Sequence, residues 1–245
     1  VVIADDGSRE LHRAADALKD QSYVLGVLTA EQLAHAIFPL GATASKALVR
    51  AKADARGLMV ANKPDSYDIC FIPDGDTRGY LADRNGAEPG VILDADGAVV
   101  GTHEGAMAFT VGQRKGLQLG VTAPDGRPRY VLNIRPKDNT VVVGPREALA
   151  IAELAGERFT WIGTPPVPER GSAATESKGT WFDCEVQVRA HADSVAATAA
   201  VIDGELVIRP TETIEGLAPG QTAVLYAGTR VLGQCTVDRT VSAVP

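Results

Sequence analysis

The sequence predicts a mixed α/β and mainly β protein, with a helical first region at 1–72 and two β-rich regions at 73–150 and 151–245. Three observations support this division. Helix-capping patterns lie before residue 72, Asp-Gly turn signals recur after it, and strict apolar/polar alternation marks the last third. With 245 residues, 45% of them hydrophobic and 22% charged, the chain has the composition of a soluble globular protein and could bury one large core or two to three modest ones.

The first region contains two segments with helix start and stop signals. Thr29 and Gln32 have the spacing of a capping box, in front of the apolar periodicity of "EQLAHAIF". Further on, "SKALVRAKADARG" begins with an N-cap candidate, Ser45, and ends at Gly57, a candidate C′ glycine. We expect both helices to lie at the edge of a larger domain.

Turn signals follow one another quickly in the second region. Asp-Gly pairs occur at 74–75, 96–97 and 125–126, separated by short apolar runs such as "AVVGTH" and "RYVLNI". This pattern predicts a small β-rich domain built from hairpins. The segment from Asp94 starts like a calcium loop, but its glycine and its last glutamate fall at the wrong loop positions, so we expect a hairpin turn there.

The third region has the clearest strand pattern. In "WFDCEVQVRA" residues alternate between an apolar face and a polar face. The apolar face consists of Phe182, Cys184, Val186 and Val188, and the polar face of Asp183, Glu185, Gln187 and Arg189. Later runs, "ELVIRP", "QTAVLYAG" and "TRVLGQCTVDRT", continue the series, with turns at 203–204 and 227–228. We expect a closed β-barrel or a sandwich, with Cys184 and Cys235 packed in its core and the Pro-rich stretch 163–179 as a long loop.

Charge argues against a general nucleic-acid binder, because the net charge is −7. The distribution is uneven, however. Between Thr110 and Arg146 seven basic residues stand against two acidic ones. This basic segment could meet phosphate groups, or it could be a solvated face balanced by acidic residues elsewhere in the fold.

Familiar catalytic and metal-binding motifs are missing from the sequence. It has no Walker phosphate loop, no G-x-S-x-G elbow and no H-E-x-x-H, and its four histidines are scattered, so we expect no metal site. No apolar stretch approaches the length of a membrane span, and the N-terminus has no signal-peptide pattern. Three cysteines do not form a disulfide framework, which favours a reducing cytoplasm.

The stretch "KPDSYDICFIPDGD", residues 63–76, contains the third cysteine, Cys70. Its short apolar run 69–72 between proline, aspartate and glycine residues allows two interpretations. The run could be a short buried strand in which Cys70 acts as a small hydrophobic residue. Alternatively, Cys70 could be a reactive thiol held on a loop.

Four blocks carry a family resemblance. They are "KDQSYVLGVLTAEQLAHAIFPLG" (19–41), "KPDSYDICFIPDGD" (63–76), "PGVILDADGAVVGTHEGAMAFTVGQRKGL" (89–117) and "PGQTAVLYAG" (219–228). In their order along the chain and in their residues they resemble the tRNA-specific 2-thiouridylases of the MnmA/TrmU type. This resemblance implies an ATP-pyrophosphatase-type α/β domain, of which 1–72 is a helical remnant, a small central domain at 73–150 and a C-terminal β-barrel at 151–245.

The resemblance also implies an activity and a role for Cys70. Family members place sulfur on C2 of the wobble uridine of tRNA, with ATP and magnesium, and a cysteine desulfurase or relay protein supplies the sulfur. By this resemblance Cys70 carries the persulfide, and a second cysteine later forms a disulfide with it. In the family that cysteine and the ATP loop precede the position of Val1, so we expect this chain alone to be inactive. The string "SYDIC" also differs from the family's S-T-G-I-C.

Matching blocks imply tRNA contacts at three places. Lys19, Asp20 and Gln21 form the family's K-D-Q, where a lysine can meet phosphate and a glutamine can read a base edge. The alternative for these three residues is a simple helix start. In the barrel, Arg189 with Ala190 matches the family's R-Y pair, without the stacking that a tyrosine would supply, and Gln221 matches the glutamine of its P-G-Q turn.

The segment "GQRKG", residues 112–116, resembles a phosphate contact. Its candidate residues are Gln113, Arg114 and Lys115, and the alternative is a purely architectural turn. For the whole chain two function classes stay open. It could be part of a sulfurtransferase with Cys70 as sulfur carrier, or a noncatalytic RNA-binding module in which the cysteines are structural.

Overall fold

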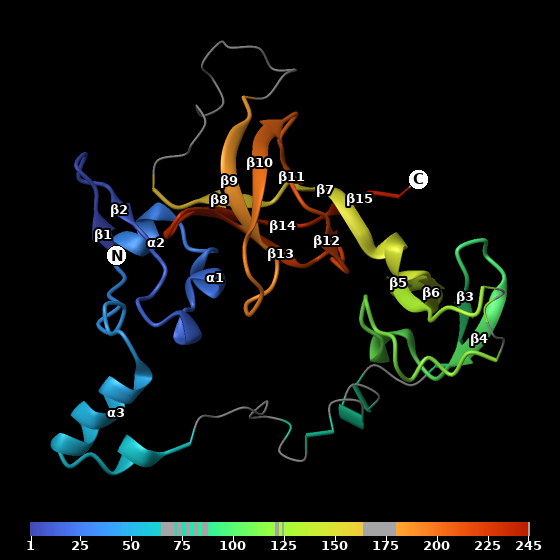
Figure 1. Ribbon diagram of the computed structural model, residues 1–245, viewed down its shortest axis with the longest axis horizontal. Coiled ribbons are helices and arrows are strands. Elements are labelled where there is room, and N and C mark those ends of the chain that lie inside the picture. Colours follow the sequence, from blue (N-terminus) through green and yellow to red (C-terminus); the bar gives the residue numbers. More distant parts are fainter. Residues whose placement is uncertain are drawn as a thin grey trace. The chain divides into compact units, whose positions relative to one another are not determined.

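The computed structural model describes most of the chain (Figure 1). The described residues are 1–64, 72, 75–76, 79–80, 83–84, 88–120, 123, 125–163 and 180–244. Cys70, the Asp74 half of the first Asp-Gly pair, and residues 164–179 of the Pro-rich stretch therefore lie outside the described residues.

The chain divides into two compact units, which are described separately. Unit 1 consists of Val1–Pro64, Ala152–Glu212 and Pro219–Val241, and unit 2 of Asp65–Ile151, Thr213–Ala218 and Ser242–Pro245. The first 64 residues thus share a unit with most of the C-terminal strands. None of the helices in the described part of the chain is long and apolar enough to cross a membrane.

Unit 1 begins with short elements. The strands β1 (Val2–Ile3) and β2 (Arg9–Glu10) pair in antiparallel fashion, and η1 (Ala17–Lys19), α1 (Ser22–Leu25) and α2 (Ala30–Ala34) follow. The predicted capping box of α2 is confirmed. The Thr29 hydroxyl accepts from the backbone N–H of Gln32 at 3.1 Å, and the Gln32 side chain accepts from the backbone N–H of Thr29 at 2.9 Å.

The second predicted helix is α3 (Lys46–Ala55). Its N-cap is Ser45, whose hydroxyl accepts from the backbone N–H of Leu48. At the other end Gly57 has a φ of +67°, the left-handed conformation expected of a C′ glycine. The turn η2 (Met59–Asn62) follows, and the Arg50 guanidinium donates to the carbonyl of Ala61 at 2.9 Å, which ties this turn to α3.

The C-terminal strands form the predicted barrel. They are β7 (Ala150–Gly156), β8 (Phe159–Trp161), β9 (Phe182–Gln187), β10 (Val195–Ile202), β11 (Glu205–Pro210), β12 (Ile214–Glu215), β13 (Thr222–Ala227), β14 (Arg230–Thr236) and β15 (Arg239–Ser242). Their order is β12-β7-β11-β10-β9-β13-β14-β8, and β15 pairs with β7. Because β15 follows β14 in the chain and returns to β7, the sheet closes on itself. The turns predicted at 203–204 and 227–228 are confirmed, and Asp203, Gly204 and Gly228 have positive φ values there.

The first residues of the chain pack against this barrel. Leu11 and Leu33 are buried in one cluster with Ile162, Val224 and other barrel residues. Leu11 accepts from the backbone N–H of Val231 at 2.8 Å, and the N–H of Arg13 donates to the carbonyl of Thr229 at 2.8 Å. These backbone hydrogen bonds place Arg13 beside the start of β14.

Strand β9 confirms the predicted alternation except at Gln187. Cys184 and Val186 are buried, and Cys235 on β14 is fully buried, as expected. Gln187, however, was expected on the polar face and is only 3% exposed. The prediction failed because the N-terminal segment covers this end of the strand, where the Arg13 guanidinium donates to the Gln187 side chain at 3.0 Å.

Unit 2 contains a four-stranded sheet. Its strands are β3 (Gly90–Leu93), β4 (Val99–His103), β5 (Tyr130–Arg135) and β6 (Thr140–Gly144), in the order β4-β3-β6-β5. Short turns η3 (Ala106–Ala108), η4 (Pro136–Asp138) and η5 (Arg146–Leu149) accompany them. The core of the sheet contains Ile92, Ala106, Leu117, Val131, Val141 and Val143.

The predicted hairpin turn between β3 and β4 is confirmed. The Asp94 carboxylate accepts from the backbone N–H groups of Asp96 and Ala98 at 3.0 and 2.8 Å, and Gly97 has a φ of +86°. The 125–126 signal was read wrongly as a hairpin. Gly126 does turn the chain, but β4 and β5, the strands before and after this turn, are not neighbours in the sheet. Strand β5 pairs antiparallel with β6 instead, and β6 pairs parallel with β3.

Candidate functional site

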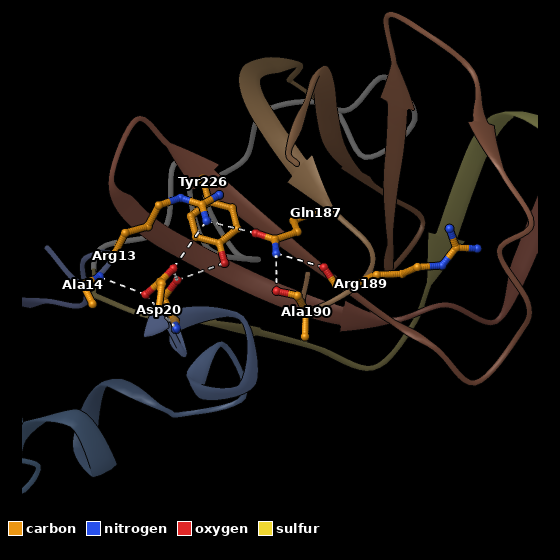
Figure 2. A network of polar contacts seen from close by, with 8 residues as sticks. Arg13, Ala14, Asp20, Gln187, Arg189, Ala190 and Tyr226 are labelled. Atoms are coloured by element: carbon orange, nitrogen blue, oxygen red, sulfur yellow. Dashed lines mark hydrogen bonds and ion pairs between the residues drawn. The ribbon is translucent and has the colours of Figure 1, made fainter. Parts of the chain in front are cut away.

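The candidate site is built around Asp20, the middle residue of the K-D-Q segment (Figure 2). One oxygen of its carboxylate accepts from the backbone N–H of Ala14 at 2.8 Å and from that of Ser22 at 3.1 Å. The other oxygen accepts from the Ser22 hydroxyl at 2.7 Å. The carboxylate therefore ties together both ends of the loop 14–22, and its acceptor capacity is used inside the protein.

Arg13 extends these contacts toward the barrel. Its Nη1 lies 3.5 Å from an oxygen of Asp20 and donates to Oε1 of Gln187 at 3.0 Å. The guanidinium carbon lies 3.7 Å from the centre of the Tyr226 ring, in cation–π geometry. Three different side chains therefore hold the guanidinium in one place (Figure 2).

Gln187 continues the contacts at the end of β9. Its Nε2 donates to the carbonyl oxygens of Arg189 and Ala190 at 2.9 and 3.3 Å. In Figure 2 the Arg189 side chain points away from Arg13. Gln187 therefore contacts residues 189–190, which we call the 189–190 corner, through their backbone carbonyl groups. We call Arg13, Asp20, Ser22, Gln187 and Tyr226 the polar network. It joins the K-D-Q segment to the 189–190 corner within unit 1.

Two tyrosines anchor α1 to β13. The Tyr226 hydroxyl, fully buried, lies 3.2 Å from the Ser22 hydroxyl, and because Ser22 donates to Asp20, Tyr226 is the donor. The Tyr23 hydroxyl donates to the carbonyl of Thr222 at 2.9 Å. Burial raises the pKa of both tyrosines, which keeps them protonated as donors.

The other predicted tRNA-contact residues of unit 1 lie at the surface around the polar network. Lys19 and Gln21 are exposed on either side of Asp20, and Arg189 and Ala190 are exposed after β9. Gln221 is partly exposed. It directly precedes Thr222, whose carbonyl accepts a hydrogen bond from the Tyr23 hydroxyl. Helix α1 begins at Ser22 with Gln21 as its N-cap, so the helix-start interpretation describes the local structure of the K-D-Q segment.

In unit 2 the GQRKG segment forms a tight turn. The Gln113 side chain accepts from the backbone N–H of Thr110 at 3.1 Å and donates to the carbonyl of Lys115 at 2.9 Å. Its backbone also accepts from Val131 on β5 at 2.9 Å. Gln113 is thus used to build the turn, while the side chains of Arg114 and Lys115 are exposed at its tip.

The two cysteines within the described residues are unsuited to carry reactive sulfur. Burial, aided by the nearby Asp183 and Glu185 carboxylates, raises the pKa of the Cys184 thiol to about 12. Burial, with a smaller contribution from Asp238, raises the pKa of Cys235 to about 12 as well. Both thiols therefore stay protonated near neutral pH, and the thiolate is the nucleophilic form.

Comparisons with known proteins cover nearly the whole chain. Three family models match in succession: "tRNA methyl transferase HUP domain" at 1–74, "tRNA methyl transferase PRC-barrel domain" at 78–145 and "Aminomethyltransferase beta-barrel domain" at 152–237. The tRNA-specific 2-thiouridylase MnmA of Leifsonia xyli is 69% identical over all 245 residues. The chain belongs to the MnmA family. It combines part of a HUP domain with a PRC-barrel domain and a C-terminal β-barrel, which confirms the predicted fold class.

Other MnmA relatives agree with this assignment. Those of Clavibacter michiganensis and Renibacterium salmoninarum are 68% and 60% identical, over 100% and 98% of the chain. The chain spans 64%, 62% and 63% of the lengths of these three relatives. It is therefore comparable with part of a MnmA protein.

The described residues of this MnmA-family chain contain no group of three or more His, Cys, Asp and Glu side chains that could hold a metal ion. Arg13, Gln187 and Tyr226 were not among the site residues predicted from the sequence. A weak signal existed for the first two, because Arg13 lies seven residues before Asp20 and Gln187 two residues before Arg189. No signal in the sequence pointed to a contact between them.

Proposed function

We propose that this chain is part of a tRNA-uridine 2-sulfurtransferase, which replaces the C2 oxygen of a wobble uridine with sulfur. The observation that carries the proposal is the 69% identity, over the whole chain, with a protein named tRNA-specific 2-thiouridylase. Further support comes from the polar network, which joins two exposed segments that each match a tRNA-contact block of the family.

The proposed chemistry begins with activation of the uridine, because a carbonyl oxygen is a poor leaving group. ATP, a co-substrate used with magnesium, transfers AMP to the C2 oxygen and releases pyrophosphate. The terminal sulfur of a Cys70 persulfide attacks C2, and AMP leaves with the oxygen. A second thiolate then attacks the Cys70 sulfur, forms a disulfide with it and releases the 2-thiouridine. We place the ATP site and the second cysteine in the full-length protein, outside residues 1–245.

Cys70 is the best candidate for the sulfur carrier among the three cysteines. Cys184 and Cys235 are buried in barrel strands, with pKa values raised to about 12. Cys70 lies outside the described residues, and its support is the matching "ICFI" block between turn-forming residues. A reactive sulfur needs an accessible setting, which the buried barrel positions of Cys184 and Cys235 do not offer.

On the proposed tRNA surface of unit 1, different residues would contact different parts of the tRNA. Lys19 and Arg189 would meet phosphates, and Gln21 and Gln221 would meet base or sugar edges. Ala190 would contribute only backbone groups to the tRNA contact at the 189–190 corner. Asp20 is negatively charged and already bonded to three donors of the loop, so it would organise the surface and not touch phosphate. In unit 2 the exposed Arg114 and Lys115 are candidate phosphate contacts.

A thiolation assay with the full-length protein tests this function. The protein is incubated with ATP, magnesium, a cysteine desulfurase with cysteine, and an unmodified tRNA transcript that has a wobble uridine. We expect ATP-dependent 2-thiouridine, measured by mass spectrometry of the digested nucleosides. If the protein binds the tRNA but forms no 2-thiouridine with any sulfur donor, the noncatalytic RNA-binding module is the correct interpretation.

A further inference from the structure

We infer that Arg13 and Gln187 are positioning residues, which hold the K-D-Q segment and the 189–190 corner in the arrangement that binds tRNA. The inference rests on the proposed function, because it takes both segments as tRNA contacts. Neither residue belongs to a block that matches the family's contact positions. What singles them out is their place in the polar network, between Asp20 and the carbonyls of Arg189 and Ala190.

Arg13 is well suited to fix a loop. Its guanidinium contacts the Tyr226 ring at 3.7 Å, the Gln187 amide at 3.0 Å and the Asp20 carboxylate at 3.5 Å. Tyr226 is fully buried in the barrel wall and cannot shift easily. A planar group stacked on a fixed ring loses little further freedom when its edge forms hydrogen bonds, so the position of Asp20 is defined relative to the barrel.

Gln187 links Arg13 to the second segment, the 189–190 corner. Its amide has only one chemically consistent orientation: Arg13 supplies donors, so Oε1 faces Arg13, and the two carbonyls are acceptors, so Nε2 faces Arg189 and Ala190. The side chain is neutral and Gln187 is only 3% exposed. It cannot contact tRNA itself, so any effect of its replacement on tRNA binding must pass through its neighbours.

The replacement Gln187→Glu separates the two halves of the network. A glutamate can still accept from Arg13, but it cannot donate to the carbonyls of Arg189 and Ala190, and its charge repels them. The 189–190 corner is therefore released, whereas the link to Arg13 and the K-D-Q segment persists. Gln234→Glu is the matched control, because Gln234 is also a buried glutamine on a barrel strand, 7% exposed, and lies outside the polar network.

The experiment measures the Kd of the 245-residue chain for an unmodified tRNA transcript with a wobble uridine, at fixed salt, by fluorescence anisotropy. We expect Gln187→Glu to weaken binding about tenfold and Gln234→Glu by less than about twofold. Lys19→Ala and Arg189→Ala are measured in the wild-type and Gln187→Glu backgrounds. In the Gln187→Glu background Arg189→Ala should have almost no further effect, while Lys19→Ala keeps its full effect. A merely structural role would not produce this difference.

Three results would overturn the inference in distinguishable ways. If Lys19→Ala and Arg189→Ala both bind like the wild type, the tRNA surface of the proposed function is wrong, and the positioning role falls with it. If they weaken binding but Gln187→Glu does not, or if Arg189→Ala acts equally in both backgrounds, only the positioning role is wrong. Should Gln187→Glu fail to fold, Arg13→Lys serves instead: it keeps the charge but loses the planar fork, and unchanged tRNA affinity in this variant would reject the inference.

Discussion

Arg13 and Gln187 are 174 positions apart in the sequence, yet Nη1 of Arg13 donates to Oε1 of Gln187 at 3.0 Å. The chain between them contains nearly all of unit 2. Because Arg13 also contacts the buried Tyr226, the N-terminal segment and the barrel wall share one set of polar contacts. The two segments that match the family's tRNA-contact blocks are therefore built as parts of a single unit.

The first prediction concerns the Tyr226 hydroxyl, which donates to Ser22 inside the polar network. Tyr226→Phe keeps the ring under Arg13 and removes this hydrogen bond only. We expect the free energy of unfolding of unit 1 to fall by about 1 kcal/mol, as is usual for one buried hydrogen bond. Urea denaturation followed by fluorescence measures the change. A loss as large as that of Tyr226→Ala would mean that the hydroxyl, and not the ring, dominates the contact.

A second prediction concerns Glu153 on β7, which forms ion pairs with Arg209 at 2.9 Å and Arg239 at 3.0 Å. Burial alone would raise the pKa of the Glu153 carboxyl, but hydrogen bonds and charges from Arg239 and Arg209 outweigh it and hold the pKa below its ordinary value. The carboxylate therefore stabilises the fold at neutral pH, and this contribution is lost as the pH falls through and below the ordinary glutamate value of about 4.3.

Glu153→Gln tests this account. At pH 7 the variant should be less stable than the wild type by about 1 kcal/mol. The difference should shrink as the pH is lowered toward 3, because the wild-type carboxyl becomes protonated too. Glu147→Gln is the control, since its ion pair with Arg127 is 3.5 Å long and exposed on both sides. A Glu153→Gln effect that does not depend on pH would show that the ion pairs are not its cause.

The sequence predicted those features that depend on neighbouring residues. The capping box at Thr29 and the helix from Ser45 to Gly57 are determined within a few residues, and the alternation around Cys184 shows which side of β9 faces the core. The burial of Gln187 could not be predicted in this way. It depends on Arg13, and local periodicity contains no information about a residue so far away in the chain.

The same reason explains the errors in unit 2 and at the candidate site. An Asp-Gly pair indicates a turn but not which strands pair, so the parallel pairing of β3 with β6 had no local signal. For the site, the resemblance supplied exposed contact candidates such as Lys19 and Arg189. The buried residues that hold them, above all Tyr226, have the appearance of ordinary core residues in the sequence.

A third prediction concerns the relative reactivity of the cysteines. In the native chain at pH 8, iodoacetamide should leave Cys184 and Cys235 unmodified, because both are buried and their pKa values are raised to about 12. We expect Cys70 to be alkylated before either of them. Peptide mass spectrometry identifies the modified residues, and denatured protein provides the control in which all three react. Rapid native modification of Cys184 would contradict its assignment to the core.

The fourth prediction separates the roles of residues in the GQRKG turn. Arg114→Glu together with Lys115→Glu should weaken binding to all tRNAs alike and flatten the dependence of log Kd on log salt, because phosphate contacts are lost. Gln113→Leu should instead lower the stability of unit 2, since the Gln113 amide bonds to Thr110 and Lys115. If the charge-reversed variant binds tRNA like the wild type, the turn is purely architectural.

The most direct test of the central claim is the thiolation activity of Cys70→Ser in the full-length protein, with Cys184→Ser as the matched control. Serine is close to cysteine in size, so tRNA binding should stay nearly unchanged in both variants. A hydroxyl cannot carry a persulfide, so Cys70→Ser should form no 2-thiouridine above background, whereas Cys184→Ser should keep most of the wild-type activity. If Cys70→Ser still forms 2-thiouridine at a rate comparable with the wild type, Cys70 is not the sulfur carrier and the proposed mechanism is wrong.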